Sequence, residues 1–184
     1  MNSLKLRRLL ITVHLCLAGL LAPAFLVVAI SGGFYLTGVE AKTETTPIEL
    51  PAGTTLDLSG ETVEEDVRAL LAEQGIDVSF EYIRGGGNRA MTRPTTRDFV
   101  TFTQGADGLT AELNKPNLQY ILMELHKGHG PWAYRMYQVL VALALFFVVV
   151  GGLAVGLLAK NYRRSTAIAA GVGLAVTFAL AVFA

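Results

Sequence analysis

The stretch MYQVLVALALFFVVVGGLAVGLLA at residues 136–159 contains no charged side chain in 24 positions. Two more stretches share this property, with 31 uncharged residues at 9–39 and 20 at 165–184. A helix crosses the hydrocarbon core of a bilayer with about 20 apolar residues, so each stretch is long enough. The sequence therefore predicts a membrane protein with an α-helical bundle of three spans, placed at 9–38, 133–159 and 165–184.

The composition agrees with this class of protein and excludes others. Of the 184 residues, 52% are apolar and 16% are charged, whereas soluble domains carry about 25% charged residues. The formal net charge is zero and no basic block stands out, so we expect no nucleic-acid partner. The single cysteine excludes a disulfide within this chain and a cysteine-based metal cluster.

Basic residues at the ends of the predicted spans indicate their orientation. Six of them flank the spans on one side, with no acidic residue among them: Lys5, Arg7, Arg8, Lys160, Arg163 and Arg164. Short, positively charged segments stay in the cytoplasm, so we expect residues 1–8 and the loop 160–164 to be cytoplasmic. Residues 39–133, which hold all 15 acidic residues, and the C-terminus are then expected on the other side of the membrane.

The first uncharged stretch predicts a retained membrane anchor. The apolar region of a secretory signal has only about 7–15 residues, which is far shorter than this stretch. Cleavage near Val39-Glu40-Ala41, a weak processing site, is the alternative.

Between the first two spans, the sequence predicts a small α+β domain at 62–127, preceded by a linker at 39–61. Thr62-Val-Glu-Glu65 matches a capping box, in which side chains satisfy free backbone amides at a helix start. Alternating apolar residues predict three antiparallel strands, at 78–82, 98–103 and 109–113. Pro116 is expected to open a second helix, with an apolar side formed by Leu118, Ile121, Leu122 and Leu125.

Short motifs in this arrangement resemble the PepSY-associated transmembrane family. The first span contains Leu9-Leu-Ile-Thr-Val-His14, then Gly19, and ends in Tyr35-Leu-Thr-Gly38; helices of this family carry a histidine near the inner end and Thr-Gly at the outer end. Leu125-His126-Lys-Gly128 resembles the family's Leu-His-x-Gly element. The external segment is similar to a PepSY domain.

The resemblance implies a bacterial inner-membrane protein with its PepSY domain in the periplasm. Larger relatives have at least four spans, and some act in reduction of iron or siderophores through haems held by membrane histidines. Soluble PepSY domains are instead associated with binding and inhibition of peptidases. This chain has three predicted spans and no histidine in the second or third. It therefore lacks a second membrane histidine with which one chain could bind a haem through two histidines.

His14 is the candidate cofactor ligand. It lies about five residues, or roughly 8 Å, into the first span, and ionisable groups within a membrane are functional candidates. Small neighbours such as Gly19 leave room for a porphyrin or for another helix. Haem ligation would need a partner ligand, from a second His14 in a homodimer or from another subunit. The alternative is a neutral imidazole that hydrogen-bonds another helix or reaches the interface.

His126 and His129 are the candidate metal ligands, because three-residue spacing places two imidazoles on one side of a helix. Only Glu124 is at hand as a further ligand, and glycines and a proline interrupt the helix. Because the ligand set is incomplete, the sequence favours interfacial residues at a joint between the domain and the membrane.

Two further residue groups are predicted to make contacts. Arg84, Arg89, Arg93 and Arg97 surround a glycine-rich hairpin tip and are candidates for binding an acidic partner or lipid head groups; a solvated basic loop is the alternative. Small residues in the second and third spans favour close helix packing, within the chain, in a homo-oligomer or with another subunit. These residues are Gly152, Gly156, Gly171 and Gly173.

The sequence contains no recognisable serine–histidine–acid set, paired carboxylates or nucleotide motif, so we assign no catalytic residue and favour a non-enzymatic role. The first hypothesis is an accessory or regulatory protein of the inner membrane, whose periplasmic domain binds a periplasmic or membrane protein. The alternative is a haem-binding subunit of a transmembrane electron-transfer system in iron or siderophore reduction.

Overall fold

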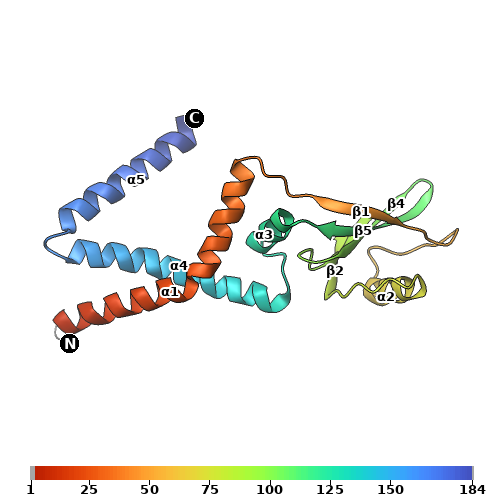
Figure 1. The fold of residues 1–184 in the computed structure, drawn as a ribbon, viewed down its shortest axis with the longest axis horizontal. Helices are drawn as coiled ribbons and strands as arrows, with labels where there is room; N and C mark the ends of the chain where they lie inside the picture. Colours follow the sequence, from red (N-terminus) through yellow and green to blue (C-terminus); the bar gives the residue numbers. More distant parts are fainter. Residues whose placement is uncertain (1–2, 184) are drawn as a thin grey trace. The chain divides into compact units, whose positions relative to one another are not determined.

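The computed structural model describes residues 3–183, with the side chains of residues 3, 4, 6 and 7 left out. The first two residues of the predicted cytoplasmic segment, the side chain of Arg7 and the last residue of the third predicted span therefore lie outside the described part. Three long helices are present: α1 (Ser3–Leu36), α4 (Trp132–Leu158) and α5 (Arg163–Phe183) (Figure 1). Each is long and apolar enough to cross a membrane, which confirms the prediction of three long apolar helices.

The chain divides into two compact units, and both boundaries fall inside long helices. The first unit holds α1 up to Pro23, α4 from Val139 onward, and α5; the second runs from Ala24 to Gln138. Pro23 lies inside α1, where a proline removes a backbone hydrogen bond and disfavours a straight helix. The second unit thus includes the last part of α1 and the first turns of α4.

The helices of the first unit expose large apolar side chains. Leu140, Phe146 and Leu174 are 63%, 62% and 74% exposed. In water this surface would drive aggregation, whereas a lipid environment solvates apolar side chains and leaves each helix to satisfy its own backbone hydrogen bonds. The exposed surface therefore agrees with a membrane protein.

The second unit contains a five-stranded antiparallel sheet with the order β1-β5-β4-β3-β2. The strands are β1 (Thr43–Ile48), β2 (Tyr82–Gly86), β3 (Arg89–Arg93), β4 (Phe99–Gly105) and β5 (Gly108–Pro116). β4 and β5 form a tight hairpin in which Phe102 lies opposite Ala111. β1 and β2 are the two edges of the sheet, so each pairs on one side only.

Two helices contact the sheet: α2 (Val63–Glu73) lies along it, and α3 (Leu118–His126) lies near one end of β5 (Figure 1). Helix α2 contributes Val67, Leu70 and Leu71 to the core, together with side chains of the sheet that include Val100 and Phe102. Burial of side chains of this size stabilises a domain by about 1.5–3 kcal/mol each. The neighbouring residue Phe99 points to the other face, because side chains alternate along a strand. Its ring stacks on Tyr120 of α3, with centroids 5.9 Å apart.

The prediction of three strands was wrong in number and in one position. β1 lies in the predicted linker; its sequence TETTPI lacks an apolar alternation and forms a strand because it pairs with β5 along its whole length. The predicted strand at 78–82 is displaced, since β2 begins at Tyr82 and continues into the glycine run. The hairpin turn itself lies at Gly87 and Asn88.

The starts of the two shorter helices also differ from the prediction. Pro116, expected to open the second helix, is the last residue of β5, and α3 begins at Leu118 after Asn117. Thr62 precedes α2, but its side chain makes no cap hydrogen bond; the hydroxyl instead donates to the Asp66 carboxylate at 2.8 Å.

The predicted apolar side of α3 is not its most buried side: Leu118 is 67% exposed, and Ile121, Leu122 and Leu125 are half-buried. The buried residues of α3 are polar, Gln119 and Glu124, since both find hydrogen-bond partners inside the domain.

Asn117 caps α3, and we expect its loss to weaken this helix. Asn117 Oδ1 accepts a hydrogen bond from the backbone amide of Tyr120 at 2.8 Å. Asn117→Ala should cost about 1 kcal/mol, measured as faster amide hydrogen exchange across α3 in the intact protein. Asn117→Asp, which keeps the acceptor, should retain most of the protection. Equal exchange in the alanine and wild-type proteins would contradict this assignment.

Candidate ligand site at His14 and polar joint around Glu124

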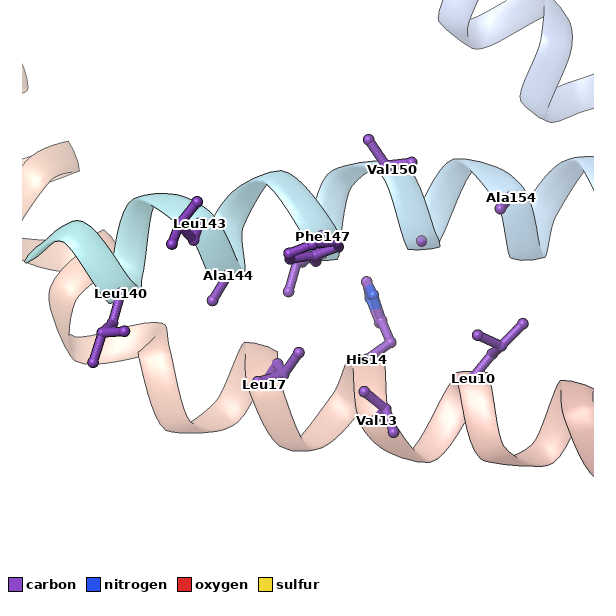
Figure 2. Close-up of a pocket in the computed structure, with 12 residues that line it drawn as sticks. Leu10, Val13, His14, Leu17, Leu140, Leu143, Ala144, Phe147, Val150 and Ala154 are labelled. Atoms are coloured by element: carbon purple, nitrogen blue, oxygen red, sulfur yellow. The ribbon is translucent and has the colours of Figure 1, made fainter. Parts of the chain in front are cut away.

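His14 lines a cavity in the first unit, between α1 and α4 (Figure 2). The cavity has a volume of about 500 Å³, within the range of roughly 300–1,000 Å³ found for small-molecule sites. Apart from His14, its described lining is apolar or glycine, and Phe147 of α4 lies beside the imidazole. The cavity is therefore an apolar site with one polar group.

Glycine on α4 allows the imidazole of His14 to come close to that helix. A Cβ added at Gly152 would lie 3.3 Å from Cε1 and 3.9 Å from Nδ1 of His14. Nδ1 is buried and has no hydrogen-bond partner among the described residues. Nε2 is then the ring nitrogen that remains for a ligand.

The described residues do not complete a haem site within one chain. A metal-bound histidine usually donates its second ring proton to a carboxylate or carbonyl, and Nδ1 of His14 lacks such an acceptor. No second axial ligand is found among the described residues that line the cavity. His14 is therefore placed at a cavity, as a cofactor ligand would be, but without the groups that would make it a haem ligand in isolation.

His126 and His129 point to different partners in the second unit. His126 Nδ1 lies 2.9 Å from Ser31 Oγ of α1, and His129 Nδ1 lies 2.8 Å from Glu124 Oε2. Within residues 3–183, no group of three or more His, Cys, Asp or Glu side chains is placed to hold a metal ion. The two histidines instead tie α3 to its surroundings.

The buried Glu124 carboxylate is the centre of a polar cluster, here called the Glu124 joint and consisting of Arg93, Thr95, Glu124, Lys127 and His129. Arg93 Nη1 donates a hydrogen bond to Glu124 Oε2 at 3.1 Å. Thr95 Oγ1 donates to the same oxygen at 2.5 Å. Lys127 Nζ donates to Oε1 at 3.3 Å. The side chains of Glu124 and Arg93 are only 7% and 8% exposed. The joint therefore fastens α3 to the segment that follows β3.

Burial of the Glu124 carboxyl raises its pKa, but the hydrogen bonds from Thr95, His129 and Lys127, with the nearby charge of His129, outweigh burial and hold the pKa below its usual value. A carboxyl whose pKa is lowered by folding stabilises the fold above its unfolded pKa, and this contribution is lost as pH falls through the folded pKa.

We therefore expect the domain to lose stability below about pH 4. Thermal unfolding of the whole protein in detergent, followed by circular dichroism between about pH 7 and pH 3, measures this loss. Glu124→Gln should flatten the acid limb of the profile. The exposed Glu112 supplies the matched control, and a Glu112→Gln profile as flat as that of Glu124→Gln would contradict the assignment to Glu124.

The four predicted contact arginines do not form one surface. Arg84, Arg89 and Arg97 are exposed, whereas Arg93 is buried and paired with Glu124. Arg93 was therefore wrongly grouped with the hairpin tip, because it lies at the far end of β3, where the strand leads into the joint. Arg84 and Arg89 flank the turn between β2 and β3.

The four predicted packing glycines also separate into two pairs. Gly152 faces His14, and a Cβ at Gly156 would lie 2.8 Å from Thr166 Cγ2 of α5. Gly171 and Gly173 have no described atom within 4 Å of an added Cβ. The first pair therefore allows close contacts within this chain, while the second faces open space in the described structure.

Sequence reasoning missed Ser31, Gln119 and Thr95. Ser31 is fully buried; its hydroxyl donates to the Val28 carbonyl at 3.1 Å, and its carbonyl accepts from Gln119 Nε2 at 3.1 Å. Ser31 and Gln119 could have been noticed in the sequence, because each is a polar residue among apolar ones, Ser31 in the first span and Gln119 in the second short helix. Thr95 offered none, because its partner lies 29 residues away.

Comparisons of this chain with protein-family models, curated proteins and solved structures find no match. The resemblance to the PepSY-associated family therefore stays a prediction.

Proposed function

We propose that this protein is an accessory or regulatory protein of the bacterial inner membrane, of the PepSY-associated type, whose periplasmic α+β domain binds another protein. The observation that carries this proposal is exposed, unpaired positive charge beside the turn between β2 and β3, at Arg84 and Arg89. Arg84 on β2 and Arg89 on β3 are exposed, as is Arg97, and none forms an ion pair with the described residues. Unpaired positive charge beside a turn suits an acidic partner surface.

Two properties of the domain support an interaction role. The domain has its own apolar core, so it can present a fixed surface. The edge strand β2 leaves one row of backbone groups without a strand partner, and extended segments of other proteins add to such edges. The partner is therefore expected to bring acidic side chains along an exposed segment or loop.

Charge reversal in the intact protein tests this role. In-cell crosslinking followed by purification of the full chain should capture a reproducible partner. The triple variant Arg84→Glu, Arg89→Glu and Arg97→Glu should lose it, whereas reversal of the exposed Lys115 on β5 should not. Absence of any reproducible partner, or its retention by the triple variant, would contradict the proposal.

The proposed topology places the N-terminus and the 160–164 loop in the cytoplasm, and residues 39–133 and the C-terminus in the periplasm. Its support is the basic flanks of the spans. Trypsin added to intact spheroplasts should cleave after the exposed Arg89. Protection of this site in intact spheroplasts, together with cleavage after lysis, would reverse the topology.

The alternative proposal, a haem-binding subunit of an electron-transfer system for iron or siderophore reduction, has one observation in its favour: His14 lines a cavity of suitable size. A second chain would have to supply the other axial ligand. A visible spectrum of the purified protein tests whether haem is bound. A Soret band in the wild-type protein that is lost in a folded His14→Ala variant would favour haem ligation by His14. A colourless preparation from haem-sufficient cells contradicts haem binding by the isolated chain.

A further inference from the structure

The cavity at His14 is long and almost wholly apolar. On α4 its lining runs from Leu140 to Ala154, roughly 21 Å along a helix, and on α1 from Leu10 to Leu17, roughly 10 Å. The length exceeds that of a single ring and matches a ring followed by an extended apolar chain. Because all residues that line the cavity belong to the first unit, the cavity is a property of that unit alone.

The environment of the imidazole indicates what its ligand must offer. Nδ1 is buried without a partner, and buried N–H groups without an acceptor are rarer than buried acceptors without a donor. The proton of a neutral His14 is therefore better placed on Nε2. This tautomer presents an N–H donor to the cavity, so a fitting ligand carries a hydrogen-bond acceptor.

Phospholipids match this site less well than a neutral ring does. The lining carries no cation for a phosphate group among its described residues. His14 lies six residues, or about 9 Å of helix, beyond Arg8, which places the donor inside the apolar region. The Phe147 ring in the lining offers a flat surface for a second ring.

We propose that the cavity between α1 and α4 binds a lipid-soluble quinone, with a ring carbonyl accepting a hydrogen bond from His14 Nε2, the ring against Phe147 and the tail along α4. This site is independent of the periplasmic partner proposed above. Three features of the cavity identify the ligand: a single hydrogen-bond donor at His14, the aromatic ring of Phe147 and an elongated apolar lining.

Equilibrium binding to the full-length protein tests the proposal. The protein is placed in phospholipid nanodiscs that contain no quinone, and a decyl-tailed benzoquinone is titrated by calorimetry. Decylbenzene, which keeps the ring and tail but has no carbonyl, is the matched ligand control. We expect the quinone to bind at one molecule per chain and decylbenzene to bind about tenfold more weakly or not at all. Equal binding of the two ligands would overturn the proposal and assign the cavity to acyl chains.

Two variants separate the hydrogen bond from the shape of the cavity. His14→Phe keeps a ring but removes the donor, and should weaken quinone binding about tenfold. Gly152→Leu should also weaken it, because an added side chain meets the imidazole at Cε1. Gly171→Leu on α5, where an added Cβ meets nothing, should bind as the wild type does. Unchanged affinity in His14→Phe or in Gly152→Leu would overturn the proposal. If either variant fails to fold, the comparison of the two ligands on the wild-type protein still decides it.

Discussion

Glu124→Gln should destabilise the α+β domain by about 3 kcal/mol, the low end of the range for breaking a buried ion pair. The substitution keeps the shape of the side chain and an oxygen that accepts from Thr95, but it removes the charge opposite Arg93. The guanidinium, only 8% exposed, would then be buried without a counter-charge. Amide hydrogen exchange of β3 and α3 in the intact protein should accelerate roughly a hundredfold.

A double variant distinguishes the loss of the pair from the loss of packing. Arg93→Met combined with Glu124→Leu replaces the pair by apolar groups of similar volume, an exchange that is often neutral or stabilising. It should exchange more slowly than Glu124→Gln alone. If the double variant is less stable than the single one, the hydrogen bonds to Thr95 and His129 dominate over the charge pair.

Gly85→Ala should disrupt the β2–β3 hairpin at a cost of about 2 kcal/mol, as expected for a side chain forced into a closely packed site. A Cβ at Gly85 would lie 2.8 Å from the Cβ of Ala90, and closer still to the Arg89 carbonyl oxygen and the Ala90 Cα. Since these are mostly backbone atoms, the strands themselves must separate. The result to measure is faster amide exchange in β2 and β3 of the intact protein.

The neighbouring glycine provides the matched control for this prediction. A Cβ at Gly86 meets no atom within 4 Å, so Gly86→Ala changes the same residue type in the same strand without a clash. It should leave exchange in the hairpin close to that of the wild type. Equal acceleration in both variants would show that loss of glycine, and not the close approach at Gly85, weakens the hairpin.

The three long helices could be predicted because uncharged length is a property of consecutive residues. The β4–β5 hairpin was predicted for a similar reason, since Gly105 to Gly108 and the alternation in β5 are local signals. β1 was missed because TETTPI becomes a strand only through its pairing with β5, about 70 residues away, as in the bond from Thr45 to Asn114. Local pattern carries no information about such a partner.

The candidate sites show the same difference between local and long-range information. His14 could be singled out because an ionisable residue in an apolar span is conspicuous, but the cavity beside it is completed by side chains of another helix, such as Phe147. Glu124 was considered only as an accompanying metal ligand, since Arg93 and Thr95 lie 31 and 29 residues away. Arg93 was placed with the exposed arginines because sequence spacing alone cannot show that it faces a buried carboxylate.

Ser31 has a practical consequence for dissecting this protein. A soluble fragment cut at residue 39 would discard Ser31, leaving Gln119 Nε2 and His126 Nδ1 without the oxygen atoms that each now contacts. In such a fragment, α3 would therefore carry two polar side chains that have lost the partners they contact in the intact chain. The compact unit that holds the sheet begins at Ala24, inside α1, so the last part of this helix is needed to complete the hydrogen bonds of α3.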